Sequence, residues 1–261
     1  MRGRALWLFL LLPLLAPLLS GCGGMATTGE EKTGKLAQDR TGAGDVYVKL
    51  AVAYMQRGQY DIALRQAQKA ISVEPDNAQA HNVAALIFAR LGENEVAERH
   101  FREALDLEPR NSYVRNAYGT FLCRQNRYQA SEQEFMLALE NPLYSSPEIA
   151  WTNAAICKRQ AGDLKQAESY LRQGLQRNPR FPLALLEMTR LLLDEGRYRA
   201  AGEYLERYMA AARPTAESLW MGVRIARQLG DEEKLERYAV MLMKNFPDSE
   251  ETQLLRESEA R

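Results

Sequence analysis

The sequence predicts an all-α fold of six consecutive helical hairpins, because two kinds of helix-ending residue recur at almost the same interval. Five glycines and one asparagine follow one another at separations of 34, 34, 36, 34 and 34 residues, and they are Gly58, Gly92, Asn126, Gly162, Gly196 and Gly230. Prolines keep nearly the same interval, at Pro75, Pro109, Pro142, Pro179, Pro214 and Pro247. Glycine and asparagine adopt the left-handed conformation that ends many helices, and proline cannot continue one. The segments between these residues carry helical patterns of apolar residues, so each interval holds two helices.

The first 21 residues are expected to form a signal peptide rather than a membrane span. Arg2 and Arg4 precede an apolar run from Ala5 to Leu19, which two prolines interrupt. At 1.5 Å per residue, a helix of about 15 residues is shorter than the ~30 Å hydrocarbon core of a bilayer. A basic start, a short apolar stretch and small residues at its end are instead typical of a secretion signal. Residues 1–21 are therefore excluded from the folded body.

The end of this segment, Leu19-Ser20-Gly21-Cys22, resembles the lipobox of bacterial lipoproteins. The resemblance implies cleavage before Cys22, diacylglycerol on its sulfur and a third acyl chain on its amine. Two or more acyl chains hold a protein stably on a membrane, whereas one binds only marginally. Because Gly23 follows, where aspartate would resemble an inner-membrane retention signal, we expect a lipid-anchored protein on the periplasmic face of the outer membrane. In a Gram-positive bacterium the motif would imply the plasma membrane, and the alternative is an ordinary signal with an incidental cysteine.

Residues 22–43 are expected to form a disordered tether that begins with the lipidated Cys22. The segment is rich in glycine, threonine and charged residues and has almost no large apolar side chains. Such a composition cannot bury enough apolar surface to offset the conformational entropy lost on folding. The tether would hold the folded body roughly 25 Å from the lipid on average and allow ~70 Å at full stretch.

Residues 44–249 resemble the tetratricopeptide repeat (TPR) family, whose 34-residue helical hairpins stack into a right-handed superhelical solenoid. Small and aromatic residues at the core positions, such as Tyr54 and Ala63 in the first repeat, carry the resemblance together with the period. The expected repeats are 44–77, 78–111, 112–147, 148–181, 182–215 and 216–249. Residues 250–261 are expected to form a short capping helix and a C-terminal tail, with Asp248 and Glu251 spaced as a capping box.

Composition and motifs argue against nucleic-acid binding and against catalysis. The 34 Lys and Arg residues balance 34 Asp and Glu residues, so the chain lacks the charge that nucleic-acid binders carry. The two histidines have no metal-binding spacing: His81 occupies a core position and is expected to be packed, whereas His100 is expected to be solvated. No nucleophile elbow, phosphate loop or redox CxxC motif is present. We therefore expect no enzymatic activity, no metal and no cofactor besides the lipid on Cys22.

Two further cysteines, Cys123 and Cys157, lie 34 residues apart on the first helices of the third and fourth repeats. The two residues inserted between these repeats make the cysteines differ by two in repeat position. In an oxidising periplasm they could form a disulfide across the irregular junction. Two small buried thiols are an equal alternative, because sequence does not supply the Cα separation that a disulfide requires.

Protein binding is the remaining class of function, since stacked helical repeats form an extended concave surface lined by their first helices. Resemblance to the repeat family implies that positions 2, 5, 9, 12 and 13 of each repeat face this groove. The groove residues expected on this basis are Val48, Val52, Met55, Asn82, Leu86, Arg90, Tyr113, Asn116, Thr120, Arg124, Thr152, Ile156, Arg159, Leu186, Arg190, Trp220, Arg224 and Arg227. The N-terminal wall would be apolar and rich in amides, and the C-terminal wall would be basic.

The N-terminal wall suggests what kind of segment binds. Val48 and Val52 stand where a carboxylate-clamping repeat would need basic and amide side chains, which argues against capture of a free C-terminus. An extended or helical peptide is favoured instead, with Asn82 and Asn116 contacting its backbone. The alternative is that Val48, Val52 and Met55 merely cover the adjoining tether.

Three stretches, combined with the lipobox and the tether, carry a more specific resemblance: YGTFLC at 118–123, NPLYSSPEIAWTNAAIC at 141–157 and LLEMTRLLLDEGRYRAA at 185–201. Together they resemble the PilF/PilW family of type IV pilus biogenesis proteins over nearly the whole chain. The resemblance implies a pilotin, an outer-membrane lipoprotein that binds secretin subunits and promotes their outer-membrane localisation and multimerisation for pilus assembly and twitching motility. The alternative is a scaffold of the same parts that holds cell-wall enzymes or other envelope machinery.

Overall fold

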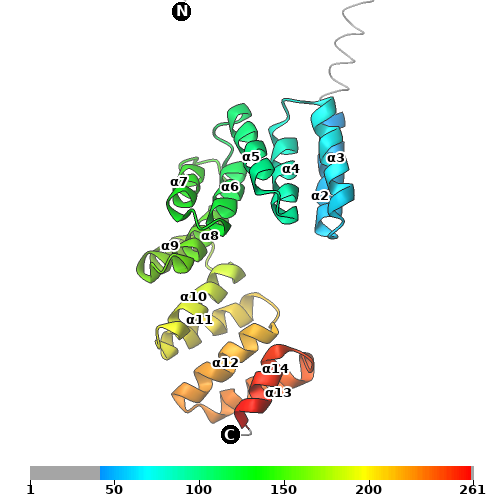
Figure 1. The fold of residues 1–261 in the computed structure, drawn as a ribbon. Helices are drawn as coiled ribbons and strands as arrows, with labels where there is room; N and C mark the ends of the chain where they lie inside the picture. The colour runs from blue at the N-terminus through cyan, green and yellow to red at the C-terminus, as the bar shows by residue number, and fades with distance from the viewer. Residues whose placement is uncertain (1–41, 260–261) are drawn as a thin grey trace, which may run out of the picture. The chain divides into compact units, whose positions relative to one another are not determined.

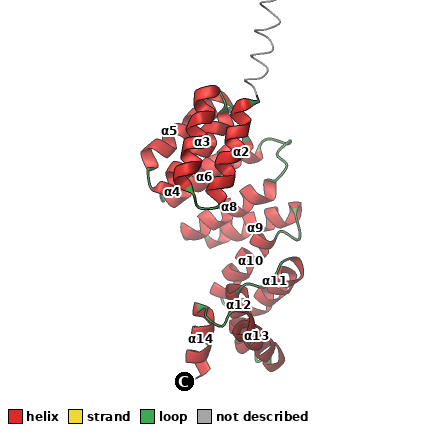
Figure 2. Ribbon diagram, turned by 90° about the vertical axis from the view of Figure 1, so that its right-hand side faces the viewer, coloured by secondary structure: helices red, strands yellow, loops and turns green. Residues whose placement is uncertain are grey.

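The computed structural model describes residues 42–259, which form α-helices and no strand (Figures 1 and 2). The helices are α2 (Ala43–Gln56), α3 (Tyr60–Val73), α4 (Ala78–Leu91), α5 (Asn94–Leu107), α6 (Ser112–Arg124), α7 (Tyr128–Leu139), α8 (Pro147–Gln160), α9 (Leu164–Arg177), α10 (Pro182–Asp194), α11 (Tyr198–Ala211), α12 (Ala216–Leu229), α13 (Glu232–Asn245) and α14 (Glu250–Glu259). The all-α prediction is confirmed. The predicted signal peptide, Cys22 and the tether up to residue 41 lie outside the described residues.

Each even-numbered helix from α2 to α12 packs against the helix that follows it, which produces six hairpins. The residue that ends the first helix of every hairpin has a positive φ, between 66° and 83° at the five glycines and 59° at Asn126. Only glycine and a few residues such as asparagine adopt this left-handed conformation readily. The sequence periodicity therefore identified the helix ends correctly, because the requirement for a positive φ is local.

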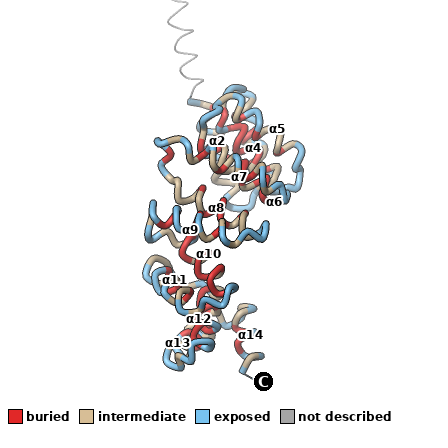
Figure 3. Tube along the Cα trace, turned by 90° about the vertical axis from the view of Figure 1, so that its left-hand side faces the viewer, coloured by how far each residue is buried: buried red, intermediate tan, exposed pale blue. Residues whose placement is uncertain are grey.

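In four of the six hairpins the first helix has more buried residues than the second, and in the first and fourth hairpins the two helices have equal numbers. In the second hairpin, α4 has eight buried residues and α5 has three. Figure 3 shows the buried segments concentrated along α4, α10 and α12. The reason is geometric: α4 contacts α2, α3, α5 and α6, whereas α5 contacts only α4 and α6. The first helices thus carry the larger share of the core and also contact one another between hairpins.

The loop between α7 and α8, which contains the two-residue insertion, folds back onto α6, the first helix of the third hairpin. Tyr144 from this loop is buried, and its ring packs edge-on against Tyr113 at a centroid distance of 5.1 Å. The hydroxyls of Tyr113 and Ser145 share a hydrogen bond of 2.5 Å. Burial raises the pKa of Tyr144 to about 12, with the neighbouring Tyr113 and Glu148 acting in the same direction. The preceding residue in this loop, Leu143, has a side chain that is 88% exposed.

A disulfide joins Cys123 of α6 to Cys157 of α8, with the two Cα atoms 5.7 Å apart. This separation lies within the range that a disulfide requires. Both cysteines belong to the largest core cluster, which extends from this junction to Leu255 in α14. Two smaller clusters hold the first hairpin and the second hairpin to their neighbours. The disulfide therefore lies at the N-terminal edge of the largest cluster, next to the inserted loop.

The last helix begins differently from the prediction. The capping box between Asp248 and Glu251 does not form, because α14 starts at Glu250 and the hydroxyl of Ser249 accepts a hydrogen bond from the backbone N–H of Thr252 at 3.2 Å. The Thr252 hydroxyl donates in turn to the carbonyl of Phe246. Leu255, fully buried, then holds α14 against the preceding hairpin.

The two histidines lie against each other inside the second hairpin. His81 is buried, as expected, but the prediction of a solvated His100 is wrong, because its ring is half-buried and stacks on Phe88 at 5.4 Å. His81 Nε2 lies 3.0 Å from the carbonyl oxygen of Pro75 and must donate to it. Neutral His81 then presents a bare Nδ1, and His100 Nδ1 donates to it across 3.1 Å. This contact joins α4 to α5.

The close approach of α6 and α7 predicts the effect of Gly119→Ala. A Cβ at Gly119 would lie 2.9 Å from the ring of Phe135 and 3.1 Å from the backbone oxygen of Ser131. Overpacking of this kind costs ~1–3 kcal/mol in the free energy of unfolding. Gly202→Ala is the matched control, since its nearest neighbour would be Ile225 Cγ2 at 3.5 Å, and it should raise stability by ~0.5–1 kcal/mol. Chemical denaturation of both variants measures the difference, and equal effects would contradict the packing argument.

The disulfide predicts the number of titratable thiols. Denatured mature protein should show no reactive thiol before reduction and two afterwards, because Cys123 and Cys157 are paired and the Cys22 sulfur is expected to carry lipid. Thiol counting with and without a reductant measures this. Two thiols before reduction, in protein purified without reductant, would exclude the disulfide.

The histidine pair predicts a loss of stability on acidification. Burial, His81 and Arg99 lower the pKa of His100, and Glu103 opposes them. As the pH falls below ~6.5, the unfolded chain therefore takes up this proton before the folded one, and the free energy of unfolding decreases. Denaturation at pH 7 and pH 5 should show a smaller pH effect in His100→Asn, whose amide can still donate to His81. An unchanged pH effect in the variant would rule out His100 as its source.

Candidate partner-binding surface

The first helices of successive hairpins contact one another in order, α2 with α4, α4 with α6, and so on to α12 with α14. We call the surface that these seven helices share the first-helix face. All eighteen expected groove residues lie on these helices. Their side chains differ in accessibility, however, and the structure separates them into buried positions, an ion-paired middle section and two clefts.

Three of the expected groove residues are buried and do not line an open surface. Val48 is 6% exposed, Asn82 is 4% exposed and Thr152 is fully buried. The Thr152 hydroxyl donates to the carbonyl of Glu148 at 2.7 Å, one turn earlier in the same helix. The expectation that Asn82 contacts a peptide backbone is therefore wrong for this conformation. The physical reason is that the surrounding helices approach closely: Val48 packs with residues of α3 and α4, and Thr152 lies beside Gly174 of α9.

The expected apolar N-terminal wall is also reduced. Val52 and Met55 are half-buried and pack with Val48 in the core cluster of the first hairpin and α4. Farther along, the side-chain oxygen of Asn116 accepts a hydrogen bond of 3.0 Å from Asn153, which links α6 to α8. These side chains hold hairpins together instead of standing free on the first-helix face.

Four expected groove residues do come together, in a cleft between α4 and α6. Its volume is about 170 Å³, and it is lined by Leu86, Ala89, Arg90, Asn94, Phe101, Ala117, Thr120, Phe121, Arg124 and Gln125. We call it the N-terminal cleft. Arg90 and Arg124 occupy the last turns of adjacent first helices and are exposed. The cleft thus combines an apolar floor with two cationic side chains.

The middle of the first-helix face is electrically neutral rather than basic. Arg190 of α10 makes ion pairs with Glu187 on its own helix and with Glu217 on α12. Arg159 of α8 lies 3.4 Å from the other oxygen of Glu187, which is buried. Burial alone would lower the pKa of Arg190, but its hydrogen bonds to both glutamates raise that pKa. Half-buried Ile156 lies on α8 and half-buried Leu186 on α10. The ion pairs join α8, α10 and α12, so this section links three hairpins.

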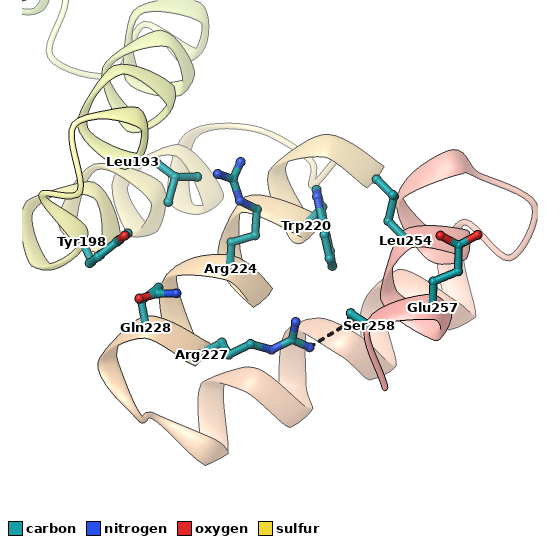
Figure 4. Close-up of a pocket in the computed structure, with 9 residues that line it drawn as sticks. All are labelled: Leu193, Tyr198, Trp220, Arg224, Arg227, Gln228, Leu254, Glu257 and Ser258. Atoms are coloured by element: carbon teal, nitrogen blue, oxygen red, sulfur yellow. Dashed lines mark hydrogen bonds between the residues drawn. The ribbon is translucent and has the colours of Figure 1, made fainter. Parts of the chain in front are cut away.

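A larger cleft, of about 460 Å³, lies between α12, α14 and the α10–α11 turn (Figure 4). We call it the C-terminal cleft, and its lining residues are Leu193, Tyr198, Trp220, Arg224, Arg227, Gln228, Leu254, Glu257 and Ser258. Trp220, Arg224 and Arg227 were expected groove residues. Sequence reasoning missed Leu254 and Ser258, because it treated α14 only as a cap. Their i, i+4 spacing on the last helix was the available signal.

Within residues 42–259 no three His, Cys, Asp or Glu side chains are grouped so that they could hold a metal ion. In the same part of the chain no helix is both long and apolar enough to cross a membrane. Both clefts offer apolar surface beside arginine, which suits binding of a polypeptide segment.

Comparison with known proteins agrees with this repeat architecture. Tetratricopeptide repeat models match residues 48–98, 83–146 and 158–221. The chain is 32% identical over 240 residues to the type IV pilus assembly protein PilF of Pseudomonas aeruginosa. The aligned region covers 92% of this chain and 94% of PilF.

Solved structures give the same relationship. The structure of Pseudomonas aeruginosa PilF has a TM-score of 0.73 at 31% identity, covering 84% of this chain and 99% of that one. PilW, a widely conserved type IV pilus biogenesis factor, has a TM-score of 0.73 at 34% identity, covering 81% and 97%. A tetratricopeptide repeat protein from Parabacteroides merdae, with a TM-score of 0.60 at 20% identity over 82% and 83%, shares the fold alone. The chain therefore belongs to the PilF/PilW family of type IV pilus assembly proteins built from tetratricopeptide repeats.

Proposed function

We propose that this protein is a pilotin, a non-enzymatic lipoprotein that binds secretin subunits in the periplasm and promotes their localisation and multimerisation in the outer membrane. In this role it supports pilus assembly and twitching motility. The observation that carries the proposal is the match to PilF along nearly the whole of both chains. The two clefts on the first-helix face support it, because they offer places where a segment of a partner protein can bind.

The proposal assigns location to the lipid and recognition to the folded body. Cys22 carries the acyl chains, and the segment from Cys22 to residue 41 connects it to the first hairpin. A secretin subunit bound to the first-helix face is then held close to the membrane, at a high effective concentration relative to other bound subunits. No cofactor takes part, and the covalent lipid is the only added group.

The anchor predicts the effect of Cys22→Ala. The variant should fold and bind secretin as the wild type does, because Cys22 lies twenty residues before the first described residue. Secretin multimers in the outer membrane should nevertheless fall or move to the inner membrane, since the variant lacks the lipid that directs it there. Membrane fractionation followed by detection of heat-stable multimers measures this. Normal outer-membrane multimers in a strain that makes only Cys22→Ala, at wild-type abundance, would refute the mechanism.

Partner identity is tested in the same strains by site-specific crosslinking. A crosslinker at Tyr113 or Trp220 reports on the first-helix face, and one at Val240, which is half-exposed on α13, is the control. Secretin in the eluate from the first two positions and not from the third supports the pilotin. Peptidoglycan enzymes in its place would support the alternative of a cell-wall scaffold.

A further inference from the structure

The C-terminal cleft has a cationic centre with apolar surface on both sides. In Figure 4, Arg224 lies between Leu193 on one side and Trp220 on the other, and Leu254 extends the apolar surface beyond Trp220. Trp220, Arg224 and Arg227 are four and three residues apart, a spacing that places them on one side of α12. The cleft therefore presents apolar, positive and apolar surface in that order.

The arginines of this cleft differ from those in the middle of the first-helix face. Arg159 and Arg190 are neutralised by Glu187 and Glu217. Among the described residues, no carboxylate lies within 4 Å of the Arg224 or Arg227 guanidinium, although Glu257 lines the same cleft. Arg227 donates to the hydroxyl of Ser258 at 3.1 Å, and both arginines are exposed. The positive charge of the cleft is thus available to a ligand.

The dimensions suit a short extended segment. Trp220 and Gln228 both line the cleft and are eight residues apart on α12, which corresponds to about 12 Å along the helix. An extended chain covers this length with about four residues. A carboxylate that binds between the arginines leaves apolar surface on both sides, which neighbouring side chains of a continuous chain can cover. A chain that ended at the carboxylate would leave one side uncovered.

We propose that the C-terminal cleft binds an extended internal segment of a partner protein in which an acidic residue has an apolar residue two positions away on each side, because side chains two residues apart point to the same face of an extended chain. The acidic side chain pairs with Arg224 and Arg227, one apolar side chain contacts Trp220 and Leu254, and the other contacts Leu193. This inference deepens the proposed function, because it assumes that the chain binds a protein partner, but it does not depend on which protein that is.

The test is a binding measurement on the purified full chain in a non-ionic detergent. The probe is a fluorescent peptide with an acetylated N-terminus, an amidated C-terminus and the sequence Gly-Leu-Ser-Glu-Ser-Leu-Gly, which places both leucines on the same face as the glutamate. Anisotropy should report saturable binding that weakens with added salt, because the contact is partly ionic. Replacing Glu by Gln in the peptide should weaken binding about tenfold or more, since a hydrogen bond to a charged group is lost.

Two variants of the protein locate the site. Arg224→Glu should weaken peptide binding about tenfold or more, and Leu254→Gln should weaken it several-fold. The matched controls are Arg65→Glu on α3 and Val240→Gln on α13, both exposed and outside the cleft, which should leave the affinity unchanged. All four variants should fold, because the substituted residues are exposed. Circular dichroism and thermal unfolding check this.

Several outcomes would overturn the inference. They are an absence of saturable binding, equal affinity in Arg224→Glu, equal affinity for the Gln peptide, and tighter binding of a peptide Gly-Ser-Leu-Leu with a free C-terminal carboxylate. Arg224-dependent binding to phosphatidylglycerol vesicles without peptide binding would also overturn it. Secretin capture in the same preparation separates the two proposals. Capture without peptide binding defeats only this inference, whereas peptide binding without capture defeats only the pilotin proposal.

Discussion

The close approach of neighbouring helices is the constraint on which the rest of this structure depends. A single hairpin cannot enclose its own apolar residues, so each first helix must pack against the hairpins on both sides. Alanine and glycine at the contacts make this possible: Ala51 and Ala63 are fully buried in the first hairpin, and Gly119 lies directly against Phe135. Backbones that approach this closely gain dispersion contacts along their whole length.

The same packing decides which part of the first-helix face remains open. Where helices pack closely the positions between them close, as for Thr152 beside Gly174 of α9, and both Asn82 and Thr152 become interior residues. The C-terminal cleft forms because α14 is a single helix that covers only part of α12. A terminal helix that completes the core thus also creates a binding surface.

Charge pairing between hairpins complements the apolar contacts and follows the repeat. Glu98 on α5 pairs with Arg127, which directly precedes the second helix of the next hairpin. Glu168 on α9 pairs in the same way with Arg197, which directly precedes α11. Each of these arginines directly follows a residue with positive φ. Glu187 performs a comparable function on the first-helix face, where it holds Arg159 and Arg190. Among the arginines on α4, α6, α8, α10 and α12, those without such a partner are the ones that line the two clefts. The distribution of acidic residues therefore determines where this face is positive.

The sequence alone determined the helix count, the helix ends and the family, because each depends on local chemistry that recurs with the repeat. A positive φ favours glycine or asparagine wherever it occurs, so Asn126 indicates a helix end without any knowledge of its neighbours. Tertiary structure decided which groove positions are accessible. Val48 and Trp220 both lie on first helices with apolar neighbours, yet Val48 is enclosed by α3 and α4 while Trp220 faces a cleft. Accessibility depends on distances between helices, and the pairing of Arg190 with Glu217 depends on a contact across 27 residues. The spacing of residues along one helix gives neither the distances between helices nor the contacts between hairpins.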